Sequence, residues 1–510
     1  LGFIASLVIS LQSNGFYQDD DITHYLLAKE GFGDWTALLH WWARPGYNFL
    51  TVLPAHWGGF LACRIWSGVQ TGLVAFLAYR IARDLMGPNP WTLWAPVLVW
   101  LQPLVFRLST TTLTETPAAL FCTLAVWLFL RGRYAWACIT MSLVFVTRYE
   151  TMALGPVWAV ALWGVALRED PGPWAKRLFS RRVVQGCLWL VWAPVLYALV
   201  AWLGDMPSDA SPIHLFTREY TAEYGTGTLD HMLLRWPEAV GFAVLVLCVA
   251  GVWSVRKKGA LLLGLIGAQL ALQSLLFWKG GYASGGYPRF MIPVSGCVAV
   301  VAAYGVRCLW SHYHKWVWTS AMLFAAVLPC MMVIRFPQYI RWSYVLAPVA
   351  LFLLFALLVY RIRPTKPSHP VGRILVVVLC LAGLGQMAVQ TRVLSLSQEK
   401  HHSLVVEALD KLEDRRSPEN RVLSQHVLVA YLLGDQGHMC SGNQAALDAW
   451  KEAEEGAWFV WENKYSFKPH EPESTEQLRN SLHAGGISVL RLNRDGAEVE
   501  VFVRTSGALD

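Results

Sequence analysis

The sequence predicts a polytopic α-helical membrane protein with a small α/β domain at its C-terminus. The chain has 510 residues, of which 55% are hydrophobic and only 15% charged, whereas soluble domains average about 25% charged residues. Its 26 Trp and 22 Phe suit the aromatic belts that form at membrane interfaces. Apolar runs long enough to cross the hydrocarbon core recur as far as residue 389 and shorten beyond it.

These runs predict about thirteen transmembrane helices. We expect the first run to be the remainder of a first span rather than a signal peptide, because no basic n-region or cleavage site is visible. The predicted spans are Leu1–Leu11, Phe60–Ile81, Trp91–Phe106, Leu113–Leu130, Tyr134–Thr147, Met152–Leu167, Val183–Leu203, Ala239–Val255, Ala260–Trp278, Met291–Leu309, Trp316–Ile334, Tyr344–Tyr360 and Ile374–Val389.

The charge distribution predicts the topology. The net charge of +7 conceals −7 from Ser395 to Asp510 and +14 in the rest of the chain. The basic excess lies in alternate short loops, which the positive-inside rule places in the cytoplasm. It therefore indicates membrane orientation and contact with membrane lipids, not nucleic-acid binding. The intervening loops and the C-terminal domain then face outward, and we expect the membrane to be a bacterial inner membrane.

Two domains follow from this pattern. Residues 1–392 form the predicted membrane domain, with a first external loop at 13–53, and residues 393–510 form the predicted extracytoplasmic α/β domain. Alternating or apolar runs predict its strands. The predicted strands are Arg421–Ser424, Ala457–Trp461, Ser488–Leu492 and Glu498–Val503, and the predicted helices are Gln398–Arg415, Val427–Leu433, Gln444–Glu454 and Glu473–Ser481.

Cysteine and histidine give no sign of a metal site. Nine of the ten Cys lie in or at the ends of apolar segments, only Cys440 lies in the tail, and no CxxC spacing occurs. We interpret them as packing residues, without a disulfide framework. The pair His401-His402 is interpreted as solvated rather than as a metal site.

Three consecutive carboxylates, Asp19, Asp20 and Asp21, follow directly after the first apolar run. Carboxylates so close to a membrane segment are costly unless they face water, a cation or a substrate. Three in a row also repel one another, so at least one pKa should be raised unless a cation lies near. A solvated acidic loop is one alternative. Another is that Asp20 or Asp21 caps a helix over Ile22–Glu30, with a second helix over Trp35–Trp42.

Other polar residues lie in the outward loops. Each has a structural interpretation when taken alone, such as snorkelling for Lys279 or a helix-end ion pair of Arg148 with Glu150. Collected at one membrane face, they predict a water-filled cavity for an anionic substrate. The positive-inside rule does not explain basic residues in outward loops. Binding of a phosphate is the simplest explanation for Arg44 and Arg289. This set comprises Asp19, Asp20, Asp21, Arg44, Glu115, Arg148, Glu150, Lys279 and Arg289.

The first outward loop resembles that of a known superfamily. The stretch Asp20–Glu30, then Gly33-Asp34-Trp35 and then Arg44-Pro45 resembles the first periplasmic loop of the C-type membrane glycosyltransferases. The lipid A aminoarabinose transferases and the protein O-mannosyltransferases are the nearest patterns. Asp21 stands where this family has Glu, and Arg44 stands where the aminoarabinose transferases have Lys.

Three further motifs resemble recurrent pieces of the same superfamily. They are Thr114–Pro117, Thr147–Glu150 and Pro288–Pro293. In the last, Arg289 matches the arginine of an Arg-Tyr-x-x-Pro-like motif. The span number and the external C-terminal domain also match, so the resemblance covers the whole chain in architecture and a few short motifs in sequence.

The resemblance implies a C-type glycosyltransferase fold and an inverting transferase. Its donor would be a mannose- or pentose-like sugar on polyprenyl phosphate, and its acceptor a hydroxyl of a lipid, glycan or protein outside the membrane. The implied catalytic base is Asp20, with Asp21 second. The implied phosphate-binding residues are Arg44, Arg289 and Lys279. The supporting residues are Asp19, His24, Glu115, Arg148, Glu150 and Tyr287.

The acidic triplet could also bind a divalent cation. If one binds, Asp19, Asp20 and Asp21 are its candidate ligands, although their spacing alone does not indicate a site.

Two other functions remain open. A lipid or solute transporter, such as a flippase of the cell envelope, could use an outward acidic loop, but transporters usually show two similar halves and charges near the midplane. The sequence shows no internal repeat and its charges gather at one face. A non-catalytic assembly subunit of a cell-envelope complex is the third possibility.

Overall fold

The computed structural model describes most of the chain, in two compact units. The membrane unit comprises Leu1–Leu11 and Leu27–Leu394, and the C-terminal unit comprises Gln12–Leu26 and Ser395–Asp510. The sequence did not reveal that Gln12–Leu26 groups with the C-terminal residues. The described residues are 1–40, 42, 44–204, 225–255, 259–281, 285–311, scattered positions between 321 and 335, 370–390, 398–415, 417, 419–434, 437–440, 442–465 and 472–505.

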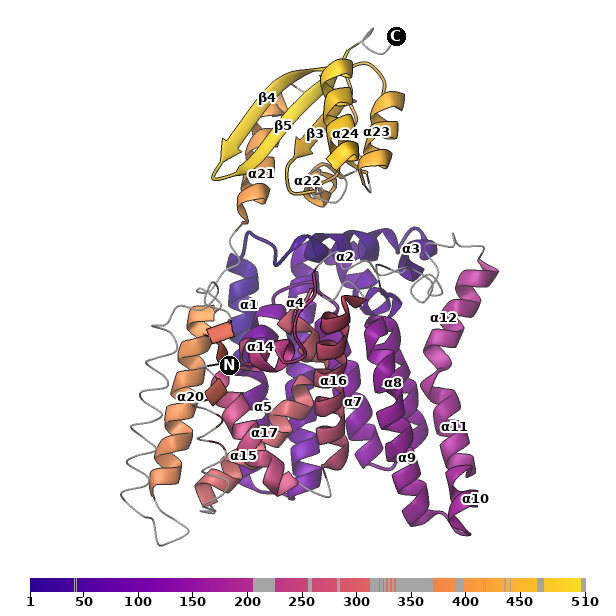
Figure 1. Cartoon of the computed structure of the whole chain (residues 1–510), viewed down its shortest axis with the longest axis vertical. Helices are drawn as coiled ribbons and strands as arrows, with labels where there is room; N and C mark the ends of the chain where they lie inside the picture. The colour runs from indigo at the N-terminus through magenta and orange to yellow at the C-terminus, as the bar shows by residue number, and fades with distance from the viewer. Residues whose placement is uncertain are drawn as a thin grey trace. The chain divides into compact units, whose positions relative to one another are not determined.

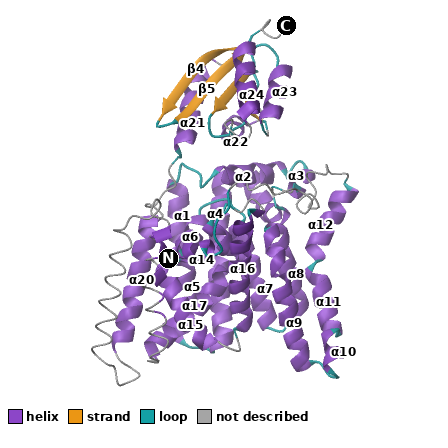
Figure 2. Cartoon of the chain, viewed as in Figure 1, coloured by secondary structure: helices purple, strands orange, loops and turns teal. Residues whose placement is uncertain are grey.

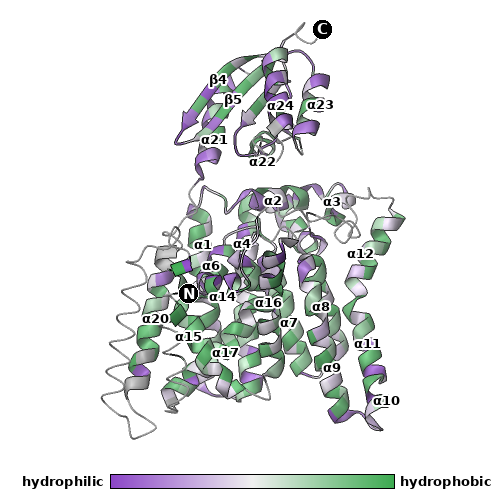
Figure 3. Cartoon of the chain, viewed as in Figure 1, coloured by the Kyte–Doolittle hydropathy of each residue, from purple (hydrophilic) through white to green (hydrophobic). Residues whose placement is uncertain are grey.

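The membrane unit is helical (Figures 1 and 3). Most of its helices are strongly apolar, because nearly every position that leaves the protein core meets lipid. Its elements are α1 (Gly2–Gln12), α3 (Trp35–Leu39), α4 (Pro45–Met86), η1 (Pro90–Leu93), α5 (Trp94–Trp100), α6 (Pro103–Leu108), α7 (Glu115–Leu130), α8 (Tyr134–Thr147), η2 (Tyr149–Leu154), α9 (Gly155–Glu169), α10 (Trp174–Leu178), α11 (Arg181–Leu190), α12 (Trp192–Leu203), α14 (His231–Val240), α15 (Phe242–Val255), α16 (Ala260–Lys279), η5 (Pro288–Val294), α17 (Ser295–Ser311) and α20 (Pro370–Gln390).

Several of these helices can cross a membrane. Within the described ranges, four are long and apolar enough to span, and two bent pairs bring the number to as many as six. The four are Pro45–Met86, Tyr149–Glu169, Ala260–Lys279 and Pro288–Trp310, and the pairs are Trp174–Leu190 with Trp192–Leu203 and His231–Val240 with Phe242–Val255. The span predicted at 344–360 lies outside the described residues, as does most of that at 316–334, so the total of about thirteen stays a prediction.

Several predicted spans are not single straight helices. The run at Val183–Leu203 divides into α11 and α12, which are bent by 43°. The run at Trp91–Phe106 divides into η1, α5 and α6, because Pro103 lacks the amide that would continue α5 and instead begins α6. The run at Ala239–Val255 contains a bend of 110° between α14 and α15. Gly241 forms this bend with φ 81°, in the left-handed region that glycine adopts without strain. The other apolar predictions within the described residues correspond to helices.

The C-terminal unit contains a mixed five-stranded sheet, whose strands are orange in Figure 2. The strand order is β2-β1-β3-β5-β4, with β1 parallel to β2 and β3, and β5 antiparallel to β3 and β4. The strands are β1 (Val422–Ser424), β2 (Gly437–Met439), β3 (Trp458–Glu462), β4 (Gly486–Arg494) and β5 (Ala497–Arg504). The helices are α21 (Lys400–Leu412), with η6 (Glu413–Arg415) after it, α22 (Val427–Leu433), α23 (Asn443–Glu452) and α24 (Pro472–Gly485).

The core of this unit lies between the sheet and α23 and α24. Trp450 of α23 is fully buried and stacks edge-on against Phe459 of β3. All five residues of β3 are buried, as expected of a central strand that is covered on both faces. The four predicted strands and four predicted helices are present, and the short strand β2 was missed because three residues carry too little pattern.

The helix that contains the acidic stretch begins three residues earlier than predicted. Helix α2 (Asp19–Glu30) contains all three aspartates in its first turn, where carboxylates favour the positive end of the helix dipole, whereas the sequence suggested a start at Ile22. The boundary between the two units falls inside α2, at Leu26. The predicted helix at Trp35–Trp42 is shorter, ending at Leu39, and is capped by Asp34, whose Oδ1 accepts the amide of Thr36 at 2.9 Å.

Candidate active site

A buried cluster of charges lies in the membrane unit. Arg148 donates from Nε to Glu150 Oε1 at 2.7 Å, and from Nη1 to Glu115 Oε1 at 2.8 Å and Thr114 Oγ1 at 3.3 Å. Its guanidinium also lies 4.4 Å from the centroid of the Phe290 ring. One arginine therefore joins the start of α7, η2 and η5, three segments that are far apart in the sequence.

Arg289 is part of the same cluster. Its Nε lies 3.4 Å from Glu115 Oε1, and its side chain is 8% exposed. The guanidinium also lies 5.4 Å from the Tyr287 ring and 5.5 Å from the Phe290 ring. Gln269 of α16 fixes this segment from the other side by donating to the Phe290 carbonyl at 2.6 Å.

The motif Arg44-Pro45-Gly46 brings a third arginine to this cluster. Pro45 begins α4, and Gly46 lies so close to α8 that an added Cβ would be 2.1 Å from Thr147 Oγ1. Only glycine permits this approach. It places the Arg44 guanidinium 4.6 Å from the Tyr149 ring, and Tyr149 is the residue between Arg148 and Glu150.

The cluster gathers charges of both signs. Arg148 pairs with Glu115 and Glu150, Arg289 lies beside Glu115, and Arg44 lies over the Tyr149 ring next to them. Among the described residues, Oε2 of each glutamate is buried without a hydrogen-bond partner. Buried polar groups are rarely left unpaired, so the site suits an anionic ligand that also presents hydrogen-bond donors, such as hydroxyls.

Lys279 has a different setting. It is the exposed last residue of α16, and its ammonium lies 4.2 Å from the Trp278 ring centroid. This is the interfacial arrangement that is typical of a lysine whose stem lies along apolar surface.

The acidic residues belong to the C-terminal unit. Asp21 is fully buried, and its Oδ2 accepts the Tyr17 amide at 3.0 Å, so it stabilises the turn that precedes α2. His24 is buried on the same helix, and Asp20 is half-buried at its second position. The prediction that Asp20 or Asp21 is the N-cap was therefore wrong, because both lie inside the first turn of α2.

Asp19 contacts the C-terminal residues directly. Its Oδ1 accepts from His402 Nε2 at 2.7 Å, and its Oδ2 accepts from Lys464 Nζ at 2.7 Å and from the Tyr465 hydroxyl. Burial alone would raise the pKa of Asp19, but the His402 hydrogen bond and the nearby His426 and Lys464 hold it well below its usual range. Asp19 is therefore ionised at neutral pH. His402 is fully buried, so interpreting it as solvated was wrong.

Asp19, His402 and His426 form a group whose ligand atoms lie within 4.8 Å of one another, close enough to hold a metal ion. The protonation of His426 is unfavourable for metal binding. His426 Nδ1 accepts the Leu428 amide at 3.2 Å, so a neutral His426 carries its proton on Nε2, the atom that would face the ion. Burial lowers the pKa of His426 to about 3. The Lys464 ammonium also lies 2.7 Å from the same carboxylate, so the residues do not fit a cation well.

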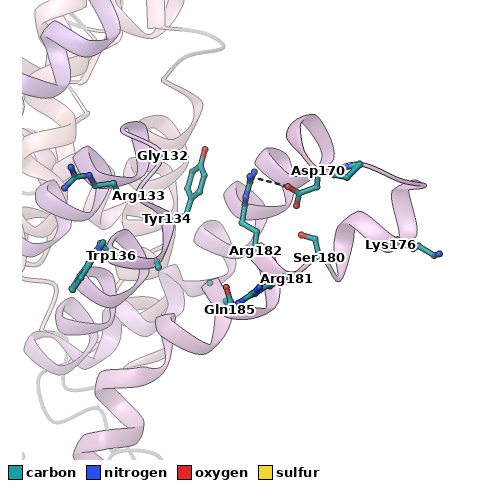
Figure 4. A pocket seen from close by; sticks show the side chains of 13 residues that line it. Gly132, Arg133, Tyr134, Trp136, Asp170, Lys176, Ser180, Arg181, Arg182 and Gln185 are labelled. Atoms are coloured by element: carbon teal, nitrogen blue, oxygen red, sulfur yellow. Dashed lines mark ion pairs between the residues drawn. The ribbon is translucent and has the colours of Figure 1, made fainter.

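The structure contains a separate cavity of about 850 Å³ near the ends of α8, α9 and α11 (Figure 4). Tyr134, Arg181 and Arg182 line it, and Arg182 is paired there with Asp170 at 3.3 Å. These arginines belong to the loops that the sequence assigns to the cytoplasm. None of the candidate site residues lines this cavity.

The sequence missed the partners of Asp19. Lys464 and Tyr465 follow the predicted strand β3, and His426 follows the predicted strand β1. The sequence therefore sufficed to place all three just beyond strand ends. What was not visible is that β1 and β3 are parallel neighbours. That pairing brings both carboxyl ends to one edge of the sheet.

The apolar helices, the buried charge cluster and the C-terminal mixed sheet define a helical membrane protein with an appended α/β unit. The fold is similar to two crystal structures of ArnT from Cupriavidus metallidurans, one bound to undecaprenyl phosphate and one in the apo state. The TM-scores are 0.64 and 0.63 and the identities 13% and 14%, and the matches cover 100% and 98% of this chain and 97% and 96% of the ArnT chains.

The chain thus shares the fold of ArnT over nearly its whole length. No protein-family model matches the sequence, and no curated protein matches it.

Proposed function

We propose that this chain is an inverting glycosyltransferase that moves a mannose- or pentose-like sugar from polyprenyl phosphate to a hydroxyl of a lipid, glycan or protein outside the membrane. The buried cluster of Arg44, Arg148 and Arg289 with Glu115 and Glu150 carries the proposal, because guanidinium groups bind a phosphate bidentately. ArnT, whose fold this chain shares, was crystallised bound to undecaprenyl phosphate.

The cluster would act on the leaving group. Arg148 is held by two carboxylates, so we assign it to the scaffold, whereas Arg44 and Arg289 bind the donor phosphate, with Lys279 next. Guanidinium groups in a buried site stabilise the charge that develops on a departing phosphate. Tyr287, beside Arg289, supports this arrangement.

Asp20 would act as the base. The Asp19 carboxylate is already used by the C-terminal residues, and Asp21 is buried against the Tyr17 amide. Asp20 accepts the proton of the acceptor hydroxyl while the hydroxyl oxygen forms a bond to the anomeric carbon. The bond from that carbon to the phosphate oxygen breaks, and its electron pair leaves with polyprenyl phosphate. Direct attack inverts the anomeric centre.

The test uses membranes that contain the full chain and a polyprenyl-phosphate sugar labelled in the sugar. The proposal expects label to leave the lipid in wild type, and Asp20→Asn to slow transfer by about 10²- to 10⁴-fold at an equal level of folded protein. Asp34→Asn is the matched control, because asparagine caps α3 as well as aspartate does. Label that crosses the bilayer without leaving the lipid would support a flippase, and Asp20→Asn activity within about threefold of wild type would exclude Asp20 as the base.

A further inference from the structure

The sheet of the C-terminal unit holds a segment from the other end of the chain. Asp19 receives three hydrogen bonds, from His402, Lys464 and Tyr465, which lie 383, 445 and 446 residues away in sequence. Its side chain is 13% exposed and that of His402 is 0% exposed. Charge-assisted hydrogen bonds to a carboxylate are about twice as strong as neutral ones, so the three together form a specific attachment.

The attachment lies beyond the carboxyl ends of two parallel strands. His426 follows β1, and Lys464 and Tyr465 follow β3, which pairs parallel with β1. In α/β folds this edge is where ligands bind. Glu462, the last residue of β3, accepts the amides of Lys464 and Tyr465 at 2.6 and 2.8 Å. Its carboxyl group thereby fixes the turn that points both donors at Asp19.

Aromatic contacts hold the segment on either side of Asp19. The Phe16 ring packs edge-on against His402 at 5.7 Å and Tyr431 at 5.5 Å between centroids. Tyr25, one and a half turns along α2, packs edge-on against Tyr431 at 5.8 Å. Such pairs add about 0.5–1.5 kcal/mol each beyond burial. The ion pair therefore lies at the centre of a longer contact.

We propose that the carboxyl edge of the C-terminal sheet is a binding site for the chain's own segment Gln12–Leu26, and that Asp19 is a positioning residue which fixes the neighbouring Asp20. The attachment stands on its own contacts, and only its catalytic consequence rests on the proposed transferase function. It also explains why three adjacent carboxylates are tolerated, since the charge of the first is neutralised by Lys464.

Hydrogen exchange of amides 16–22 in the full chain tests the attachment without reference to activity. Lys464→Met and Tyr465→Phe are expected to speed this exchange by about tenfold or more, because each removes a donor from a largely buried carboxylate. Lys464→Arg should restore most of the protection. Lys411→Met is the matched control, since Lys411 pairs with Glu407 on the exposed side of α21. In this variant the exchange of amides 16–22 should stay within about twofold of wild type.

Unchanged exchange in both Lys464→Met and Tyr465→Phe would overturn the proposal. In an Asp19→Asn background, Lys464→Met should add little, because their shared contact is already lost. For the catalytic consequence, Lys464→Met should lower kcat while KM for the donor stays within about twofold, and an equal loss in Lys411→Met would overturn the positioning role. If wild type transfers no sugar, the proposed function fails, but the exchange result still decides the attachment.

A metal ion bound by Asp19, His402 and His426 gives a different result. His426→Asn keeps a side chain that can cap α22 but removes the Nε2 that would hold an ion. If the attachment forms without a metal ion, amides 16–22 of this variant should exchange within about twofold of wild type, and EDTA should leave their exchange unchanged. Faster exchange in wild type after EDTA, with zinc bound one to one before it, would replace the proposal with a metal site.

Discussion

Replacing Arg148 by methionine should destabilise the membrane unit more than any comparable surface change. Methionine matches the length and volume of the aliphatic stem but removes the guanidinium. The substitution breaks the contacts to Glu150 at 2.7 Å and to Glu115 at 2.8 Å. Arg289 Nε remains 3.4 Å from Glu115 Oε1.

The burial of the three partners sets the magnitude. The side chains of Arg148, Glu115 and Glu150 are 7%, 1% and 3% exposed. Removing one member of a buried ion pair costs about 3–5 kcal/mol, because the remaining charge stays in a medium of low dielectric constant. Two carboxylates lose a partner here, so we expect the upper part of that range.

The chain contains a matched control. Arg182 also contacts two carboxylates, Glu169 at 2.7 Å and Asp170 at 3.3 Å, but its side chain is 29% exposed. A pair open to solvent contributes about 0–1 kcal/mol. Arg182→Met should therefore have little effect, although the same number of ion pairs is lost.

The assay is the thermal transition of the full chain in detergent micelles at matched concentration. Arg148→Met is expected to lower the midpoint by about 5 °C or more, and Arg182→Met by about 1 °C or less. Adding Glu150→Gln to Arg148→Met should recover part of the loss, since it removes the charge of the carboxylate that Arg148 contacted at 2.7 Å. Equal shifts in the two arginine variants would refute the claim that burial makes the cluster costly to break.

Three further outcomes are expected. Gly46→Ala should destabilise by about 1–3 kcal/mol, because its Cβ would meet Thr147 Oγ1 at 2.1 Å, whereas Gly72→Ala, with open space around it, should be neutral or stabilising in the same thermal assay. Burial raises the pKa of Glu462 to about 8 from an ordinary 4.5, so folding favours its protonated form. Stability should fall as pH rises between these values, by up to about 1.4 kcal/mol per pH unit. Glu462→Gln should abolish this slope in the hydrogen exchange of β3, corrected for intrinsic rates, and a slope that persists would contradict the assignment. Arg289→Ala should lower kcat/KM for the donor by about 10²-fold, and Arg289→Lys should restore only part of it, because lysine cannot bind a phosphate bidentately; full recovery with lysine would show that charge alone suffices.

Local features of the fold could be predicted because their signals are local. Helix α8 occupies the predicted range Tyr134–Thr147, and α22 occupies Val427–Leu433. Apolar length and strand alternation are read within a window of 10–20 residues. The bend at Gly241 was missed because the apolar run continues through it without a change in composition.

The site could be predicted only in part. The motif residues Arg148, Glu150, Glu115 and Arg289 were singled out, and the structure brings them together. The attachment of Asp19 was not foreseen, because a contact between residues more than 380 positions apart leaves no periodic pattern. It depends on the order of strands in the sheet, which a single sequence does not specify.

The most direct test of the central claim is the amount of polyprenyl phosphate released for each sugar transferred. The measurement uses the purified full chain in vesicles, with a polyprenyl-phosphate sugar and an acceptor extract supplied outside. The account predicts one lipid phosphate released for each glycosidic bond formed, an inverted anomeric centre in the product, and neither event with Asp20→Asn. Sugar that reaches the far leaflet still attached to its lipid, or release that persists unchanged in Asp20→Asn, would contradict it.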